Sequence, residues 1–284
     1  MYIIEPEGIN DLLIRKNRYR FVDCRFSLTD ENWGEIEYQK KHIAGAVYFH
    51  LEKDLSGPVQ VHGGRHPLPN LSKFKLRLEE SGIDNDTVVF AYDQGGAPFA
   101  ARFWWLMKYV GHKNVYVVNG GYPRLVEVGF QTEEQIPRYQ KCTYEIQLQP
   151  QLFADVTEVK EVVAGKKDAI LIDSREYKRY IGEIEPIDKK AGHIPGAIHK
   201  DWQSGIASGR FKDKRSQKDR FHDLPLEKEI IVYCGSGVTA APNMLLLKDI
   251  GFPNVKLYIG SFSDWISYPE NNVATKDSLN DNLR

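Results

Sequence analysis

Short apolar runs recur along the chain at spacings that suit alternating strands and helices. Three of them in the second half are Ala169–Asp173, Ile230–Tyr233 and Val255–Tyr258, each typical of a buried strand in a parallel sheet. Between the last two runs, Ala240–Ile250 carries three consecutive leucines and suits a helix. Because strands separated by helices form right-handed crossovers, the pattern predicts an α/β fold whose parallel sheet is covered by helices on both faces.

The two halves of the chain repeat one another. Four blocks recur in the same order at offsets of 140 to 151 residues: Phe21–Arg25 with Leu171–Arg175, Lys41–Ala46 with Gly192–Ala197, Val88–Asp93 with Glu229–Cys234, and Gly111–Val115 with Gly251–Val255. A period this long exceeds that of solenoid repeats and indicates two complete domains of one fold. The first copy has about ten more residues between its second and third blocks.

The repeat sets the expected domain limits. We place the first domain at residues 1–135, a polar linker at 136–149, the second domain at 150–276 and a loose polar tail at 277–284. The predicted fold class is therefore α/β, with two tandem domains that each hold a parallel sheet flanked by helices.

Composition and charge exclude several classes of protein. The 284 residues carry a net charge of −1, balanced in both halves, so the basic excess of a nucleic-acid-binding protein is missing. No apolar run approaches the roughly 20 residues that span a membrane, and the N-terminus lacks the pattern of a signal or transit peptide. We therefore expect a cytoplasmic protein without a membrane partner. Three cysteines, at positions 24, 142 and 234, are too few and scattered for a disulfide scaffold or a zinc site.

One of these cysteines opens a loop that suits covalent chemistry. The segment Cys234–Thr239 follows a predicted strand and precedes a predicted helix, where ligands bind in parallel α/β sheets. Gly235 and Gly237 permit close approach of the backbone, so that successive N–H groups can turn toward the sulfur. The helix N-terminus adds positive potential, and both effects stabilise the nucleophilic thiolate. We expect Cys234 to be a reactive thiol rather than a buried structural cysteine.

Three segments carry a resemblance to a known family. CGSGVTA at Cys234–Ala240 resembles the active-site loop of the two-domain sulfurtransferases, the rhodanese and mercaptopyruvate sulfurtransferase family. GHIPGA at Gly192–Ala197 and DSR at Asp173–Arg175 resemble further signatures, and the resemblance covers nearly the whole chain. It implies two rhodanese-like domains, of which the first has lost its cysteine. Asp93 stands opposite Cys234 in the repeat, and we expect it to cap a loop in a catalytically silent domain.

The resemblance also implies a reaction in two steps. The thiolate takes a sulfane sulfur from a small anionic donor and becomes a persulfide. An acceptor such as cyanide or a dithiol then removes that sulfur. A thioredoxin-like protein is one expected acceptor. The N–H groups of the loop, over Gly235, Gly237, Val238 and Thr239, would stabilise the negative terminal sulfur. Neither a metal nor an organic cofactor is implied, and we expect a monomer.

Further side chains are candidates for the site. Arg175 is expected to bind the donor anion, the alternative being a structural pair with Asp173, and Arg179 is either a second anion ligand or a solvated surface charge. Ser236 is expected to hydrogen-bond the donor or transfer a proton, or else to be a turn residue. Thr239 is expected to be a helix N-cap or a loop brace.

One histidine is a candidate for proton transfer. His66, in the extra segment GGRHPLP of the first domain, resembles the family's inter-domain histidine and is expected to protonate the departing group. Glu52–Asp54 is a candidate source of a carboxylate that orients it. His193, His199 and His222 are expected to be structural or surface residues.

Two features disagree about the donor. Thiosulfate enzymes of the family carry basic side chains at the positions of Gly235 and Ser236, so the uncharged loop favours mercaptopyruvate. Ile181 stands where the mercaptopyruvate pattern has a second arginine, and thiosulfate enzymes have an apolar residue there. We prefer mercaptopyruvate, because the loop contacts the reacting sulfur, and use of both donors stays open.

Two other functions are weighed against sulfur transfer. Cysteine phosphatases need an arginine six residues after the cysteine to clamp the phosphoryl group, and position 240 is Ala240. A non-catalytic module that carries sulfur or regulates a partner is the other alternative.

Overall fold

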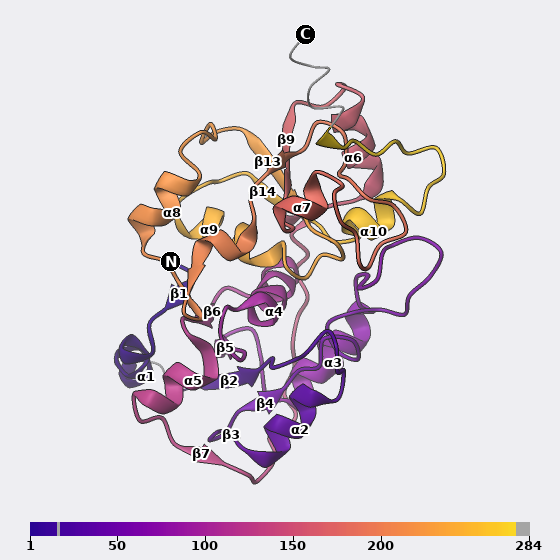
Figure 1. The fold of residues 1–284 in the computed structure, drawn as a ribbon. Helices are drawn as coiled ribbons and strands as arrows, with labels where there is room; N and C mark the ends of the chain where they lie inside the picture. The colour runs from indigo at the N-terminus through magenta and orange to yellow at the C-terminus, as the bar shows by residue number, and fades with distance from the viewer. Residues whose placement is uncertain (16–17, 277–284) are drawn as a thin grey trace. The chain divides into compact units, whose positions relative to one another are not determined.

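The computed structural model describes residues 1–15 and 18–276 and divides into two compact units. Unit 1 contains Met1–Gly57, Pro69–Gln149 and Ile206–Lys212. Unit 2 contains Pro58–Leu68, Pro150–Gly205 and the chain from Asp213 onward. Figure 1 labels the helices and strands of both units. The tail expected at residues 277–284 lies outside the described residues.

A five-stranded parallel sheet forms the centre of each unit. The strand order is β1-β6-β5-β2-β4 in unit 1 and β8-β14-β13-β9-β10 in unit 2, which is the same order of equivalent strands. The strands of unit 1 are β1 (Ile3–Ile4), β2 (Tyr19–Asp23), β4 (Val47–Tyr48), β5 (Val88–Tyr92) and β6 (Val115–Val118). Those of unit 2 are β8 (Phe153–Ala154), β9 (Ala169–Asp173), β10 (Ile198–His199), β13 (Glu229–Tyr233) and β14 (Val255–Tyr258). The α/β fold class with two copies is confirmed.

Helices follow the strands in both units. Unit 1 has α1 (Ile9–Arg15), α2 (Trp33–Lys40), α3 (Leu71–Glu80), α4 (Pro98–Tyr109) and α5 (Gly121–Glu127). Unit 2 has α6 (Val156–Val163), α7 (Tyr177–Tyr180), α8 (Lys214–Arg220), α9 (Ala241–Asp249) and α10 (Ser261–Trp265). Short antiparallel pairs join β3 (His42–Ile43) to β7 (Thr132–Glu133) and β11 (Ile206–Ala207) to β12 (Arg210–Phe211), both within unit 1.

The alternation of side chains along each strand explains why helices lie on both faces of the sheet. In unit 2, Leu171, Ile231 and Tyr233 form one core cluster with Phe262 and Trp265 of α10, and side chains of α6 pack against it. The residues between them point to the opposite face, where α9 contacts β13 and β14. Because both faces are covered, β13 reads in the sequence as an almost continuous apolar run.

The predicted elements agree closely with the structure, whereas the units are not continuous stretches of chain. The predicted strands at Ala169–Asp173 and Val255–Tyr258 coincide with β9 and β14, and the predicted helix contains α9. However, residues 58–68 of the expected first domain belong to unit 2, and residues 206–212 of the second belong to unit 1. The extra residues of the first copy therefore include a segment that serves the other unit.

The stretch expected to be a linker packs along unit 1. The N–H groups of Cys142, Gln147 and Gln149 donate to carbonyl groups of Glu79, Val110 and Tyr109, at 2.8 to 3.1 Å. The Tyr144 side chain between them is fully buried. Residues 136–149 are thus part of the surface layer of unit 1.

Two of the three cysteines are in unit 1 and are poorly suited to nucleophilic chemistry. Cys24 is buried directly after β2, where burial and then the nearby Asp23 and Asp93 raise the pKa of its thiol well above the ordinary value. Burial also raises the pKa of Cys142. Both thiols therefore stay protonated at neutral pH, in the form that does not attack.

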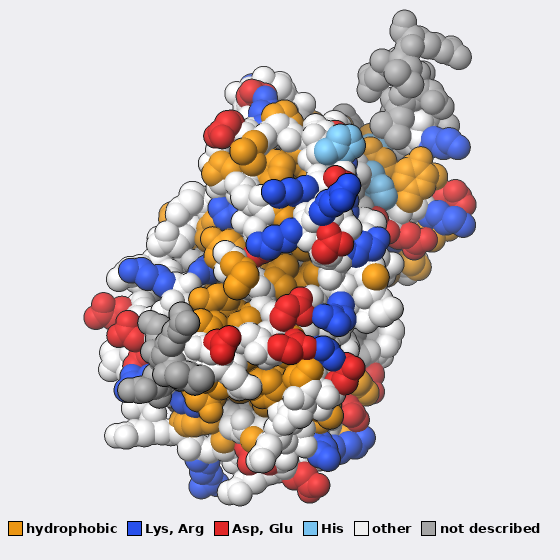
Figure 2. All heavy atoms as spheres, turned by 90° about the vertical axis from the view of Figure 1, so that its left-hand side faces the viewer, with side chains coloured by type: hydrophobic (Ala, Val, Ile, Leu, Met, Phe, Trp, Pro, Cys, Tyr) orange, Lys and Arg blue, Asp and Glu red, His pale blue; other side chains and the backbone are white. Residues whose placement is uncertain are grey.

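The surface matches the near-neutral net charge. Figure 2 shows acidic and basic side chains interspersed over one face. Among the described residues, no helix is long and apolar enough to cross a membrane.

Asp93 closes the loop of unit 1 that corresponds to the cysteine loop. One carboxylate oxygen accepts the N–H groups of Gly95 and Ala97, at 3.0 and 3.2 Å, and the other accepts those of Phe99 and Ala100, at 3.1 and 3.2 Å. Burial of the carboxyl outweighs these hydrogen bonds and raises the pKa of Asp93 to about 6. An internal anion therefore occupies the loop.

We predict that Asp93→Asn destabilises unit 1, because the amide nitrogen cannot accept the two N–H groups that one carboxylate oxygen now accepts. The free energy of unfolding should fall by about 2 kcal/mol or more. The raised pKa of Asp93 contributes stability that is present below about pH 4 and is lost as the pH rises through about 6, and the variant lacks this contribution. The deficit should therefore be larger at pH 5 than at pH 7.5.

Urea unfolding at both pH values, followed by tryptophan fluorescence, measures this difference, since Trp104 and Trp105 lie buried in α4 of the same unit. Asp86→Asn removes an exposed carboxylate and serves as the control, with a change within about 0.5 kcal/mol. Equal stability of Asp93→Asn and the wild type at both pH values would contradict the assignment.

Candidate active site

Cys234 lies at the carboxyl end of β13, just before α9, and its backbone is held on both sides. Its N–H donates to Ser261 Oγ at 3.1 Å, and its carbonyl oxygen accepts the N–H of Phe262 at 3.0 Å. Both partners are at the start of α10, which follows the neighbouring strand β14. The side chain is buried, with 1% of its surface exposed. Two adjacent strands thus fix the position of the sulfur.

The loop after Cys234 directs an amide at the sulfur. The N–H of Gly237 donates to Cys234 Sγ at 3.2 Å. Gly237 has φ +75°, and a Cβ at this position would lie 2.1 Å from the Ile259 carbonyl oxygen, so the loop requires glycine here. Val238 is buried beside it. The expectation that Thr239 is the N-cap of α9 is wrong. The helix begins at Ala241, so its N-cap is Ala240, one residue after Thr239.

Ser236 and His66 form a pair in unit 2. Ser236 Oγ lies 2.9 Å from His66 Nδ1, and both side chains are buried. The tautomer of the ring determines which atom donates. The segment that carries His66 is attached to α10, because the N–H of Gly63 donates to Asp264 at 2.7 Å and that of Arg65 donates to Ser263 Oγ at 3.2 Å.

The carboxylate expected to orient His66 has partners within unit 1. Asp54 accepts the N–H of His50 at 2.8 Å and lies 3.7 Å from Arg77 Nε. Burial raises the pKa of Asp54. The link from Glu52–Asp54 to His66 stays a prediction.

Arg175 braces the end of β9. It donates from Nε and Nη2 to Asp173, at 2.6 to 3.1 Å, and from Nη2 to the Gly192 carbonyl oxygen at 2.6 Å. The residue is 98% buried, and its guanidinium lies over the Phe262 ring. In unit 1, which has no cysteine in the corresponding loop, Arg25 makes the same contacts with Asp23 and a backbone carbonyl. Arg175 therefore makes the contacts of a structural pair with Asp173, which is the alternative to binding the donor anion.

Arg179 and Arg65 lie over the cysteine loop. A Cβ built on Gly235 would be 2.8 Å from Arg65 Nη2 and 3.5 Å from Arg179 Nη2. Arg179 also donates to Glu185 at 2.7 and 3.1 Å and to Asp188 at 2.9 Å, and Asp188 pairs with Arg65 as well. The absence of a side chain at Gly235 therefore leaves room for two guanidinium groups.

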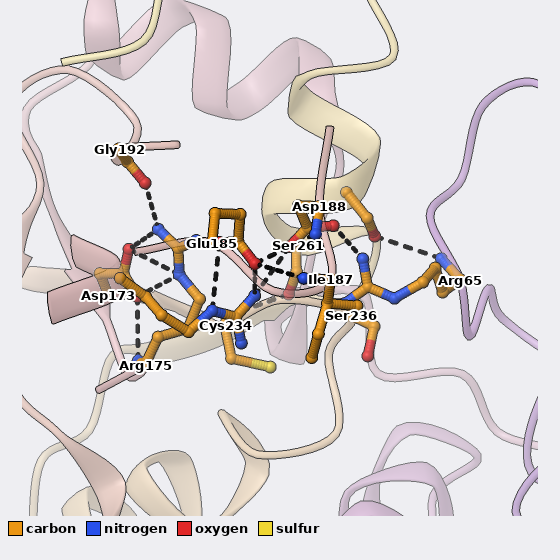
Figure 3. A network of polar contacts seen from close by, with 12 residues as sticks. Arg65, Asp173, Arg175, Glu185, Ile187, Asp188, Gly192, Cys234, Ser236 and Ser261 are labelled. Carbon is orange, nitrogen blue, oxygen red and sulfur yellow. Dashed lines mark hydrogen bonds and ion pairs between the residues drawn. The ribbon is translucent and has the colours of Figure 1, made fainter. Parts of the chain in front are cut away.

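The arginines and carboxylates of this network balance in charge. Arg65, Arg175 and Arg179 face Asp173, Glu185 and Asp188, and in Figure 3 the contacts run past Cys234 and Ser236. Burial alone would raise the pKa of Glu185, but the hydrogen bonds from Arg179 outweigh it and the pKa is lowered. For Asp188 burial dominates and raises the pKa, although Arg65 opposes it. An incoming anion must therefore compete with an internal carboxylate.

Sequence reasoning missed Arg65, Glu185 and Asp188. Arg65 is adjacent to the recognised His66, which was the available signal. The two carboxylates lie between the DSR and GHIPGA segments, in a stretch with no signature of its own.

The other histidines have structural contacts. His193 Nδ1 lies 2.7 Å from the Tyr180 carbonyl oxygen, and His199 Nε2 lies 2.8 Å from that of Arg175. His222 is exposed, with Nδ1 2.7 Å from the Asp219 carbonyl oxygen.

Comparison with known proteins gives a consistent family. The rhodanese-like domain model matches residues 7–127 and again residues 155–268. A probable 3-mercaptopyruvate sulfurtransferase of Pseudomonas aeruginosa is 39% identical over 90% of this chain and 92% of its own. The thiosulfate sulfurtransferase of Rattus norvegicus is 30% identical over 90% and 88%.

Solved structures agree. A 3-mercaptopyruvate sulfotransferase from Escherichia coli superposes with a TM-score of 0.80, at 29% identity over 93% of this chain and 99% of that one. The fold, the duplicated sheet and the two matched regions all indicate two rhodanese-like domains. The chain therefore belongs to the family of two-domain rhodanese-like sulfurtransferases.

Proposed function

We propose that the protein transfers a sulfane sulfur from 3-mercaptopyruvate or thiosulfate, through a persulfide on Cys234, to cyanide or a dithiol acceptor. The observation that carries the proposal is the Gly237 N–H directed at the buried Cys234 sulfur. The names of relatives from Pseudomonas aeruginosa and Rattus norvegicus support the two donors. We further propose a monomeric cytoplasmic enzyme whose dithiol acceptor is a thioredoxin-like protein.

The first step forms the persulfide. The Cys234 thiolate attacks the donor sulfur and forms an S–S bond. With mercaptopyruvate the C–S bond breaks and its electron pair leaves on carbon as the enolate of pyruvate, which needs one proton. With thiosulfate the S–S bond breaks and sulfite leaves without needing a proton. The acceptor then attacks the terminal sulfur, and Cys234 regains its thiolate.

The loop stabilises the negative sulfur of this intermediate. Preorganised N–H groups lower the energy of an anion that forms next to them. Unit 1 supplies an internal parallel, because two N–H groups of its corresponding loop and two of the first turn of α4 hold the Asp93 carboxylate. In unit 2 the same position in the chain carries a thiol, so the anion forms there during turnover.

The donor anion is bound by Arg179 and Arg65. Both guanidinium groups lie over Gly235, and Arg179 forks onto carboxylates in the way it would fork onto a donor. In the free protein, Asp188 forms ion pairs with both arginines at this position. The positive charges thus come from residues outside the loop, and the loop itself is uncharged. An uncharged loop is the feature on which we base the preference for mercaptopyruvate.

The nucleophile is tested by Cys234→Ser, which should lower thiocyanate formation from either donor by about a thousandfold or more. Mass spectrometry of the wild type after incubation with donor should show one added sulfur atom, located on Cys234. Cys142→Ser is the matched control and should retain activity. Activity that persists in Cys234→Ser would rule out the mechanism.

Proton delivery is tested by Ser236→Ala and His66→Gln. Each should lower kcat with mercaptopyruvate about a hundredfold, because the enolate must be protonated, and should change kcat with thiosulfate far less. His222→Gln, an exposed histidine in the same unit, is the control. An equal loss with both donors would show that the pair supports the loop rather than delivering a proton.

Donor binding is tested by Arg65→Met and Arg179→Met. Each should raise KM about tenfold or more for both donors, since each removes a charge-assisted contact with the anion. Arg175→Met should instead lower the free energy of unfolding by about 3 kcal/mol or more, because it removes the guanidinium that pairs with the buried carboxylates of Asp173 and Glu185. Arg215→Met removes an exposed arginine and should change neither quantity. Unchanged KM in both Arg65→Met and Arg179→Met would contradict this donor site.

A further inference from the structure

Ser261 has an unusual backbone conformation next to the reactive cysteine. It is fully buried at the start of α10 and has φ +55°, in the left-handed region that residues with a side chain rarely adopt. The equivalent residue of unit 1 is Gly121, with φ +58°, the residue type that this conformation favours. A serine retained at such a position requires a compensating contact.

The compensating contact involves Cys234 directly. Ser261 Oγ accepts the N–H of Cys234 at 3.1 Å and donates to the carbonyl oxygen of Tyr258 at 2.9 Å. The hydroxyl therefore joins the carboxyl ends of β13 and β14. Unit 1 has no room for such a side chain, because a Cβ at Gly121 would lie 2.4 Å from the Asp93 carbonyl oxygen.

The fold itself does not need this hydroxyl. In unit 1 the N–H of Tyr122 donates to the Asp93 carbonyl oxygen at 2.8 Å, which is the counterpart of the bond from Phe262 to Cys234 at 3.0 Å. The same turn is thus built on a glycine in the copy that lacks the cysteine. The serine occurs in the copy that carries the thiol.

We propose that Ser261 is a positioning residue that fixes the direction of the Cys234 side chain toward the loop amides. Ser261 binds the N–H of Cys234 and Phe262 binds its carbonyl oxygen, so the backbone from which the side chain extends is held on both sides, and Sγ accepts the Gly237 N–H at 3.2 Å. The hydroxyl also occupies the N–H of Cys234. The inference rests on the proposed role of Cys234 as the nucleophile.

The test uses two variants that lose the same hydroxyl but differ in backbone strain. Ser261→Gly relieves the left-handed conformation, whereas Ser261→Ala retains a Cβ in it. If the hydroxyl positions the thiol, both variants lower kcat about tenfold with KM for the donor unchanged. Both also slow the alkylation of Cys234 by iodoacetamide, because the sulfur no longer has one fixed position. Urea unfolding should show Ser261→Gly to be at least as stable as Ser261→Ala.

The control is Ser208, a serine with φ +48° in an exposed turn between β11 and β12. Ser208→Gly should leave kcat and the alkylation rates unchanged. A wild-type kcat and a wild-type alkylation rate in Ser261→Gly would overturn the proposal. A loss of kcat that tracks the free energy of unfolding of the two variants would also overturn it. Alkylation needs no turnover, so a wild type that fails to transfer sulfur would refute the proposed function without deciding the role of Ser261.

Discussion

The hold of the first turn of α10 on the backbone of Cys234 is the constraint on which the site depends. Ser261 and Phe262 bind the N–H and carbonyl groups of Cys234, and Ser263 donates its N–H to the Gly235 carbonyl oxygen at 2.9 Å. Asp264 of the same turn accepts the N–H of Gly63 and so holds the segment that carries Arg65 and His66. A single turn therefore holds the proposed nucleophile, its loop and the segment with the proposed proton donor, and small shifts in this turn would misalign all three.

Charge compensation explains how one loop design serves two different copies. In unit 1 the carboxylate of Asp93 accepts four backbone N–H groups, so an anion that is part of the chain occupies this place. In unit 2 the loop carries Cys234, and the balancing carboxylates stand beside it, on Glu185 and Asp188. Carboxylates that pair with arginines can be displaced by a donor of the same charge. The carboxylate of Asp93 cannot be displaced in this way, because it is covalently part of the loop.

Much of the fold was accessible from the sequence because its determinants are local. Strands buried on both faces leave apolar runs, and these located β9 and β14 to the residue. The internal repeat revealed two copies of one fold, and comparison of the copies separated Cys234 from Asp93. Glycine at Gly237 could also be read locally, since its positive φ belongs to the loop itself.

From the sequence alone, the fold class, the duplication and the family could be predicted, and Cys234 could be named as the candidate nucleophile. The distant residues that come together around the cysteine loop could be found only in the folded chain, because Ser236 and His66 are 170 positions apart and Arg65 and Asp188 are 123 apart. The segment at residues 58–68 belongs to unit 2, and neither repeat nor periodicity records such an exchange. The contacts of Arg175 likewise depend on packing, because the buried guanidinium gives to Asp173 donors that an exposed arginine would offer to solvent.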